Sequence, residues 1–132
     1  MDDIGKLILR LTVAILMVFH GISKLRHGVA WMAGPLEAHH LPAWIGYGVY
    51  VGEVVAPILL IAGIFTRPAA LVVAFNMLMA MFLVLGPKTF AIDHQTGALG
   101  GELPLLYLFS ALAIALLGSG RFALSKGRGR WN

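Results

Sequence analysis

The chain has 132 residues, enough for one domain, and only 12% of them are charged while 59% are hydrophobic, with a mean hydropathy of +0.86. A soluble domain carries roughly 25% charged residues. Too few polar side chains are present to coat a water-soluble globule, which excludes a soluble enzyme, a disordered protein and a nucleic-acid-binding protein despite the net charge of +4. The absence of cysteine excludes disulfides, thiolate metal sites and iron–sulfur clusters. The composition predicts a small integral membrane protein.

Four apolar segments are long enough to cross a bilayer as helices, which takes about 17–25 residues. They cover residues 4–25, 43–65, 68–86 and 102–118. Pro68 and Pro104 lie in the first turns of the third and fourth segments, where the missing N–H is not needed. Gly86-Pro87 ends the third segment. The sequence therefore predicts an all-α fold, a single transmembrane domain over residues 1–132 built as an up-down-up-down four-helix bundle.

Basic residues are distributed unequally between the two sides of this predicted bundle. The side that carries both termini and the turn at residues 66–68 holds seven of them: Lys6, Arg10, Arg67, Arg121, Lys126, Arg128 and Arg130. The other side holds Lys24, Arg26 and Lys88. Because Lys and Arg in short loops favour the cytoplasm, both termini are predicted to be cytoplasmic, with outer loops at about residues 26–42 and 87–101. The loop with Trp31 and Pro35 is predicted to lie at the membrane interface.

Ionisable side chains gather in the outer half of the predicted bundle. His20 and Lys24 lie one turn apart on the first helix, and Glu53 lies about ten residues into the second. Glu102 begins the fourth helix and Asn76 lies near the middle of the third. A charge at this depth costs about 2.5 kcal/mol or more, so it normally faces the protein and has a partner. The sequence predicts one outer-half cavity, lined by His20, Lys24, Glu53 and Glu102.

Two interpretations of these residues are open. In a functional site, His20 and Glu53 are the catalytic candidates, because imidazole and carboxyl groups exchange protons. Lys24, Glu102 and Asn76 are then the ligand-binding candidates. In the structural interpretation, Glu53 is paired or hydrogen-bonded to fix helix packing, and the others extend to the interface, complement a helix dipole or join helices.

Other residues favour structural roles. Arg10 can reach the inner head groups, and Arg67 lies in the tight turn before the third helix. Gly48 and Gly52 are four residues apart, a spacing that allows another helix to approach closely, and Pro57 is expected to kink the helix just after Glu53.

A metal site is the weaker interpretation, and none is predicted. His39, His40 and His94 are candidate imidazole ligands beside His20 and Glu53, but adjacent histidines point apart and no helical i,i+4 pair is present. A further set of side chains alternates around the third helix, as expected for packing and lipid contact: Met77, Met79 and Met81.

Several short stretches occur in the order found in one membrane protein family. They are Leu9-Arg10-Leu11, His20-Gly21-x-x-Lys24-Leu25, Leu41-Pro42-Ala43-Trp44, the Glu53 helix, Gly63-Ile64-Phe65-Thr66-Arg67, Gly100-Gly101-Glu102-Leu103 and Leu117-Gly118-Ser119-Gly120-Arg121-Phe122-x-Leu124. The set covers about residues 4–126 and resembles the DoxX family of small four-helix membrane proteins. The chain departs from the family only near a helix end, where Gly118-Ser119-Gly120-Arg121-Phe122-Ala123 replaces the usual Gly-Pro-Gly-Arg-Tyr-Ser.

The resemblance implies a multi-pass protein of the bacterial inner membrane with a redox association, since the family is named for a subunit of a thiosulfate:quinone oxidoreductase. We therefore expect a non-autonomous oxidoreductase subunit with a quinone as candidate cofactor. No haem, flavin or iron–sulfur motif is present to store electrons, so a redox partner protein is expected to supply them. A homo-oligomer is the other assembly that we expect. The alternative is a non-catalytic membrane scaffold, an assembly factor, or a protein that binds or transports a small molecule.

Overall fold

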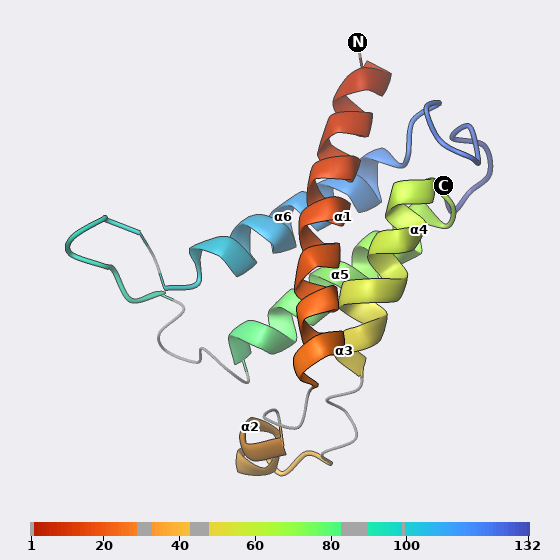
Figure 1. Ribbon diagram of the computed structural model, residues 1–132. Coiled ribbons are helices and arrows are strands. Elements are labelled where there is room, and N and C mark those ends of the chain that lie inside the picture. The colour runs from red at the N-terminus through yellow and green to blue at the C-terminus, as the bar shows by residue number, and fades with distance from the viewer. Residues whose placement is uncertain (1, 29–32, 43–47, 83–89, 99) are drawn as a thin grey trace.

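The computed structural model describes residues 2–28, 33–42, 48–82, 90–98 and 100–132, and the regular elements among these residues are helices, with no β-strand (Figure 1). The elements are α1 (Asp2–His27), α2 (Ala33–Ala38), α3 (Gly48–Tyr50), the π-helix η3 (Val51–Val55), α4 (Ala56–Ala62), α5 (Thr66–Ala80) and α6 (Glu102–Leu117). The all-α prediction is confirmed. Trp31, the side chain of Pro35 and the predicted stop at Gly86-Pro87 lie outside the described residues.

The long helices lie in the four apolar segments of the sequence. In the second segment, α3, η3 and α4 follow one another without a break. Within the described part of the chain, one stretch is long and apolar enough by itself to cross a membrane, Asp2–Ser23 of α1. The other apolar helices are shorter, Gly52–Ala62, Thr66–Ala80 and Glu102–Leu117.

The helices pack around one apolar core. α5 packs along α6, α4 contacts both α1 and α5, and η3 lies against α1 and α5 (Figure 1). Small side chains at the centre let the helix backbones approach closely. The buried residues are Val13, Ala14, Met17, Ala56, Leu60, Ala69, Ala70, Val73, Ala74, Met77, Met81, Tyr107, Leu108, Ala111 and Ile114.

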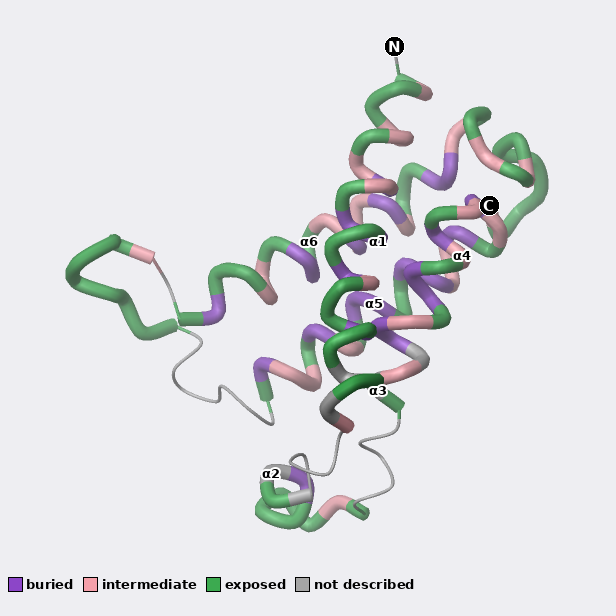
Figure 2. Tube along the Cα trace, viewed as in Figure 1, coloured by how far each residue is buried: buried purple, intermediate pink, exposed green. Residues whose placement is uncertain are grey.

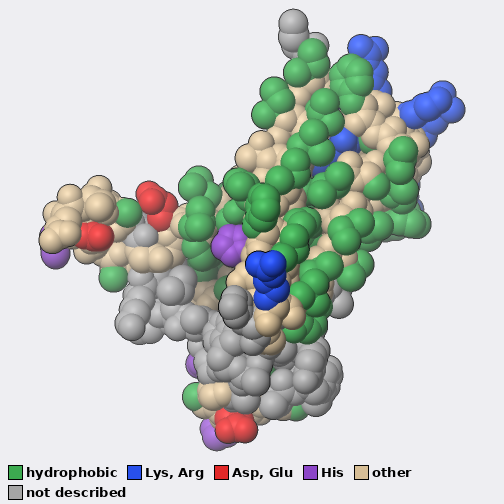
Figure 3. All heavy atoms as spheres, in the orientation of Figure 1, with side chains coloured by type: hydrophobic (Ala, Val, Ile, Leu, Met, Phe, Trp, Pro, Cys, Tyr) green, Lys and Arg blue, Asp and Glu red, His purple; other side chains and the backbone are tan. Residues whose placement is uncertain are grey.

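Exposed residues follow the outward faces of the same helices (Figure 2), and many of them carry large apolar side chains (Figure 3). Examples from three helices are Ile8 and Phe19 on α1, Phe75 on α5, and Phe109 and Leu116 on α6, all exposed. Soluble monomers rarely expose contiguous apolar patches larger than a few hundred Å². This surface matches the low charge of the sequence and suits contact with lipid.

The segment after α6 folds back onto the end of the molecule that carries both termini, opposite α2 (Figure 1). Arg10 of α1 is 1% exposed and donates hydrogen bonds to the main-chain oxygens of Ser119 (2.9 Å) and Phe122 (2.6 Å). The Ser125 hydroxyl donates to the Gly63 main-chain oxygen at 2.6 Å. The Arg10 side chain is thus enclosed by protein rather than extended toward head groups, and it ties the last segment to α1.

Arg67, at the start of α5, fixes the end of α6. Its Nη1 donates to the main-chain oxygens of Ala115 (3.1 Å) and Leu116 (2.9 Å). The last carbonyls of a helix have no partner within it, and a cation there also complements the helix dipole. Arg67 therefore links the beginning of one helix to the end of its neighbour.

Replacing Arg10 with methionine should lower the free energy of unfolding by about 3 kcal/mol, because hydrogen bonds to charged groups contribute about 1.5–3 kcal/mol each and two main-chain carbonyls, one buried and one partly buried, lose their donor. Chemical unfolding in detergent measures this. Arg128→Met is the control, since the Arg128 residue is exposed. Equal stability of the two variants would show that Arg10 does not hold the last segment in place.

Candidate functional site

Glu53 lies in the π-helical turn of the second apolar segment. Pro57 has no N–H, so it cannot donate the usual helical hydrogen bond to the main-chain oxygen of Glu53 four residues earlier. Single π-helical turns of this kind occur frequently at functional sites. The missing donor at Pro57 thus contributes to the departure from α geometry next to the one carboxyl group of this segment.

Two glycines let the neighbouring helices press against this turn. A Cβ at Gly21 of α1 would collide with the main-chain oxygen of Glu53 and lie 2.7 Å from Val54 Cγ2. A Cβ at Gly52 would lie 2.7 Å from both Cβ and Cγ of Asn76 on α5. Both glycines are therefore required by contacts that leave no room for a side chain.

The carboxylate of Glu53 is held inside the helix bundle. The residue is 4% exposed, and its Oε1 accepts a hydrogen bond from Asn76 Nδ2 at 3.1 Å. Burying a carboxylate is costly without hydrogen-bond partners, and the Asn76 amide offsets part of this cost. The amide also fixes the direction in which the carboxylate points.

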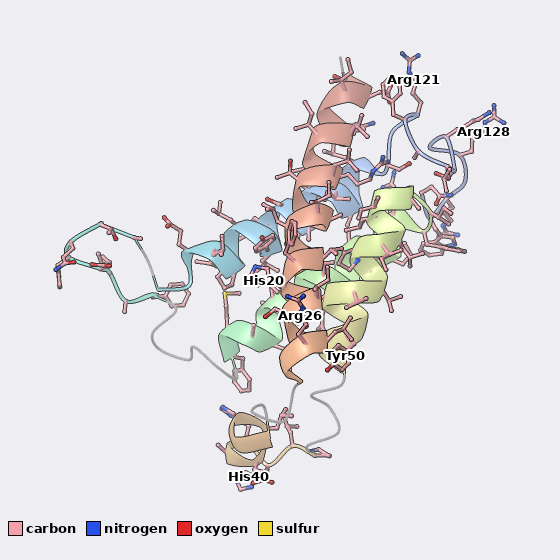
Figure 4. The ribbon with its side chains drawn as sticks, in the orientation of Figure 1. His20, Arg26, His40, Tyr50, Arg121 and Arg128 are labelled. Carbon is pink, nitrogen blue, oxygen red and sulfur yellow. The ribbon has the colours of Figure 1, made fainter. Side chains whose placement is uncertain are left out.

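A cavity of about 160 Å³ lies beside Glu53, between α1, η3, α5 and α6. The lining residues are Met17, His20, Glu53, Met77, Ala80, Leu103, Pro104 and Tyr107. His20 and Leu103 are exposed, so the cavity opens on the side of the molecule between α1 and α6, where Figure 4 shows His20. Apart from three polar side chains its walls are apolar.

These three polar side chains are His20, Glu53 and Tyr107. The rings of His20 and Tyr107 meet edge to face, with centroids 5.9 Å apart and planes at 90°. Tyr107 is 8% exposed. An imidazole, a carboxyl group and a phenol can each hold and pass on a proton, and each can form a hydrogen bond with a ligand oxygen.

The structure brings together some of the residues that the sequence predicts for one cavity. His20 and Glu53 share it, and Asn76 reaches it indirectly through Glu53. Glu102 instead is exposed and lines a separate groove with Phe109 and Ser110. The side chain of Lys24 lies outside the described residues.

Tyr107 is the residue that reasoning from the sequence alone misses. The sequence does contain a signal for Tyr107, which lies in the apolar helix α6. Its hydroxyl usually needs a hydrogen-bond partner when buried, which indicates a polar site nearby. For Gly48, by contrast, the sequence predicts a close helix contact that the described residues do not make. No described atom lies within 4 Å of the position that its Cβ would take, so packing against described residues does not explain it.

The histidines considered as metal ligands lie elsewhere. His39 packs on the ring of Phe82, with centroids 4.7 Å apart, and His94 is exposed in the loop before α6. In the described ranges, three or more His, Asp or Glu side chains nowhere come close enough to hold a metal ion.

Comparisons with known proteins find one matching family and a bacterial relative. The DoxX family matches residues 5–86, more than half of the chain. A Haemophilus influenzae protein, described as uncharacterized, is 37% identical over 120 residues, which cover 88% of this chain and 84% of the relative. No solved structure matches the chain. The chain belongs to the DoxX family of membrane proteins.

Proposed function

We propose that this protein is a multi-pass subunit of a redox assembly in the bacterial inner membrane, and that the cavity beside Glu53 binds the head group of a quinone. The observation that carries the proposal is the grouping of one imidazole, one carboxyl group and one phenol around a small space with otherwise apolar walls. Membership of the DoxX family and the exposed apolar side chains support the membrane location.

The proposed topology has four antiparallel spans with both termini in the cytoplasm. Seven basic residues on the terminal side against three on the other favour this orientation. Both ends of the chain lie toward one end of the molecule (Figure 1), and Arg121 and Arg128 lie at that end as well (Figure 4). The cavity is then in the outer half of the bundle.

The size of the cavity suits a ring. A cavity of about 150 Å³ can hold benzene, and the present one is about 160 Å³. Leu103 lines the cavity and is 53% exposed, so an apolar tail attached to the ring can pass it and remain in lipid. The residues present therefore fit the head group of a lipid-soluble quinone.

The chemistry requires two protons and two electrons. A quinone, when bound, supplies two ring oxygens that each take up one proton as two electrons reduce the ring. His20 and Tyr107 can donate hydrogen bonds to these oxygens, as Glu53 can in its protonated form, and all three groups can exchange protons with them. The chain has no cysteine and no evident electron-storing motif, so the electrons come from a redox partner protein.

A second candidate function is a non-catalytic membrane scaffold. The hydrogen bond between Asn76 and Glu53 favours it, because a satisfied carboxylate can serve helix packing alone. In this case the cavity has no ligand, and the hydrogen bond serves only to hold η3 against α5.

The two functions differ in what remains bound after purification in a mild detergent. Mass spectrometry should find about one quinone per chain in the wild type, and markedly less in His20→Ala. His94→Ala is the matched control, because it removes an imidazole from an exposed loop away from the cavity. Absence of quinone in the wild type, or equal retention by His20→Ala, would favour the scaffold.

A further inference from the structure

A second hollow lies at the end of the molecule that carries both termini. Its volume is about 280 Å³, and its lining includes four basic side chains and one acidic one: Lys6, Arg67, Arg121, Lys126 and Asp3. They come from α1, from the start of α5 and from the segment after α6. The hollow does not overlap the cavity beside Glu53.

Positive charge dominates this hollow. The carboxylate of Asp3 lies 3.6 Å from Arg121 Nε and accepts a hydrogen bond from the Arg121 main-chain N–H at 3.2 Å. Within the described chain, no ion pair joins Lys6, Arg67 or Lys126 to a carboxylate side chain. Like charges that converge repel one another, and an anion bound between them relieves that repulsion.

The last segment of the chain builds the wall of the hollow. Gly120 and Gly127 both line it and have φ of +74° and +71°, a conformation that side chains rarely adopt. A Cβ at Gly127 would also lie 2.8 Å from the Gly120 main-chain oxygen. Asn132 lies in the wall too, where its main-chain oxygen accepts a hydrogen bond from the Ser119 N–H at 2.9 Å. The hollow is thus part of the docked structure of this segment.

One basic side chain is held in place by the protein itself. Arg67 donates from Nη1 to the end of α6, and its Nη2 lies 3.0 Å from where a Cβ at Gly118 would be. Among the described residues, Nη2 has no hydrogen-bond acceptor. It is therefore a fixed donor, and a fixed guanidinium suits an oxyanion.

One apolar side chain borders the hollow. Leu117 lines it and is 47% exposed. A ligand with a charged head and an apolar chain could contact the basic side chains and Leu117 together. The preference of basic residues for the cytoplasmic side explains why the four basic residues of the hollow lie on one side of the membrane. It does not explain why they line the same hollow.

We propose that this hollow binds a phosphate anion, supplied by the head group of an anionic lipid in the membrane leaflet at that end. Lys and Arg donate charge-assisted hydrogen bonds to phosphate oxygens, and basic pockets beside membrane helices suit such head groups. The site is independent of the proposed quinone cavity.

The test compares two double variants of the full chain in detergent. Lys6→Gln/Lys126→Gln removes two charges from the hollow, and Arg128→Gln/Arg130→Gln removes two charges from the same tail but outside the lining. The thermal midpoint is titrated with phosphatidylglycerol, with phosphatidylcholine, or with inorganic phosphate. Phosphatidylglycerol should stabilise the wild type and the Arg128/Arg130 variant. The Lys6/Lys126 variant should bind it at least about tenfold more weakly, because it loses hydrogen bonds between charged groups that the lining makes to the phosphate.

The remaining outcomes show whether the bound phosphate comes from lipid or from solution, and whether the proposed site exists. If inorganic phosphate reproduces the stabilisation and the Lys6/Lys126 variant loses it, the site takes free phosphate groups as well as lipid ones. If both double variants lose the effect equally, general surface charge explains it and the proposed site is wrong. Equal stabilisation of the wild type by phosphatidylglycerol and phosphatidylcholine would also overturn the proposal.

Discussion

Glu53→Gln is expected to reduce quinone reduction at least about 100-fold in membranes that carry the native assembly, with little effect on folding. A general acid or base contributes about 10²–10⁴ to a rate, and the amide cannot exchange the proton that the carboxyl group exchanges. The amide has nearly the same shape, and its oxygen can still accept the hydrogen bond from Asn76. The free energy of unfolding should therefore change by less than about 1.5 kcal/mol, the usual limit for volume-conserving changes in a core.

The control for this variant is Glu102→Gln, which makes the same chemical change in a residue outside the cavity lining. Its rate of quinone reduction should equal that of the wild type. A structural role for Glu53 gives a different pattern, in which Glu53→Gln lowers stability and the rate falls only in proportion to the amount of folded protein. That pattern would remove Glu53 from the proposed chemistry.

Gly21→Ala is expected to lower the free energy of unfolding by about 3 kcal/mol. The added Cβ would collide with the main-chain oxygen of Glu53 and lie 2.8 Å from its carbonyl carbon. Backbone atoms cannot move aside as the end of a flexible side chain can, so α1 must shift as a whole. Overpacking of a core costs about 1–3 kcal/mol, and a clash with backbone belongs at the upper end of that range.

Gly5→Ala is the matched control on the same helix, because nothing lies within 4 Å of the position of its Cβ. Alanine favours a helix over glycine by about 0.5–1 kcal/mol, so Gly5→Ala should be neutral or stabilising. Chemical unfolding of both variants in one detergent gives the comparison. Two variants of equal stability would contradict the close contact between α1 and η3.

The parts of the fold that depend on local sequence could be predicted. Apolar length and the prolines at helix starts locate α1, α5 and α6, because these signals depend on neighbouring residues only. The π-helical turn could not be located, since it combines the missing N–H of Pro57 with contacts from two other helices. The docking of Arg10 onto Ser119 joins residues 109 positions apart, and no local pattern encodes it.

The candidate site was predictable to a similar extent. The depth of Glu53 and the position of His20 on its helix place both near one cavity, and the structure brings them to the same one. Glu102 begins its helix in the expected place, but rotation of α6 about its axis decides which side chains face inward. That rotation turns Tyr107 toward the cavity and leaves Glu102 in another groove, and it depends on packing against α5.

Photolabelling tests most directly whether a quinone ring occupies the cavity lined by His20, Glu53 and Tyr107. A short-chain azidoquinone is added to the purified protein in detergent, irradiated, and located by peptide mass spectrometry. The label should appear on residues 17–20 of α1 and 103–107 of α6, and unlabelled quinone should compete for it. Label spread evenly over the exposed apolar faces, without competition, would contradict quinone binding in this cavity.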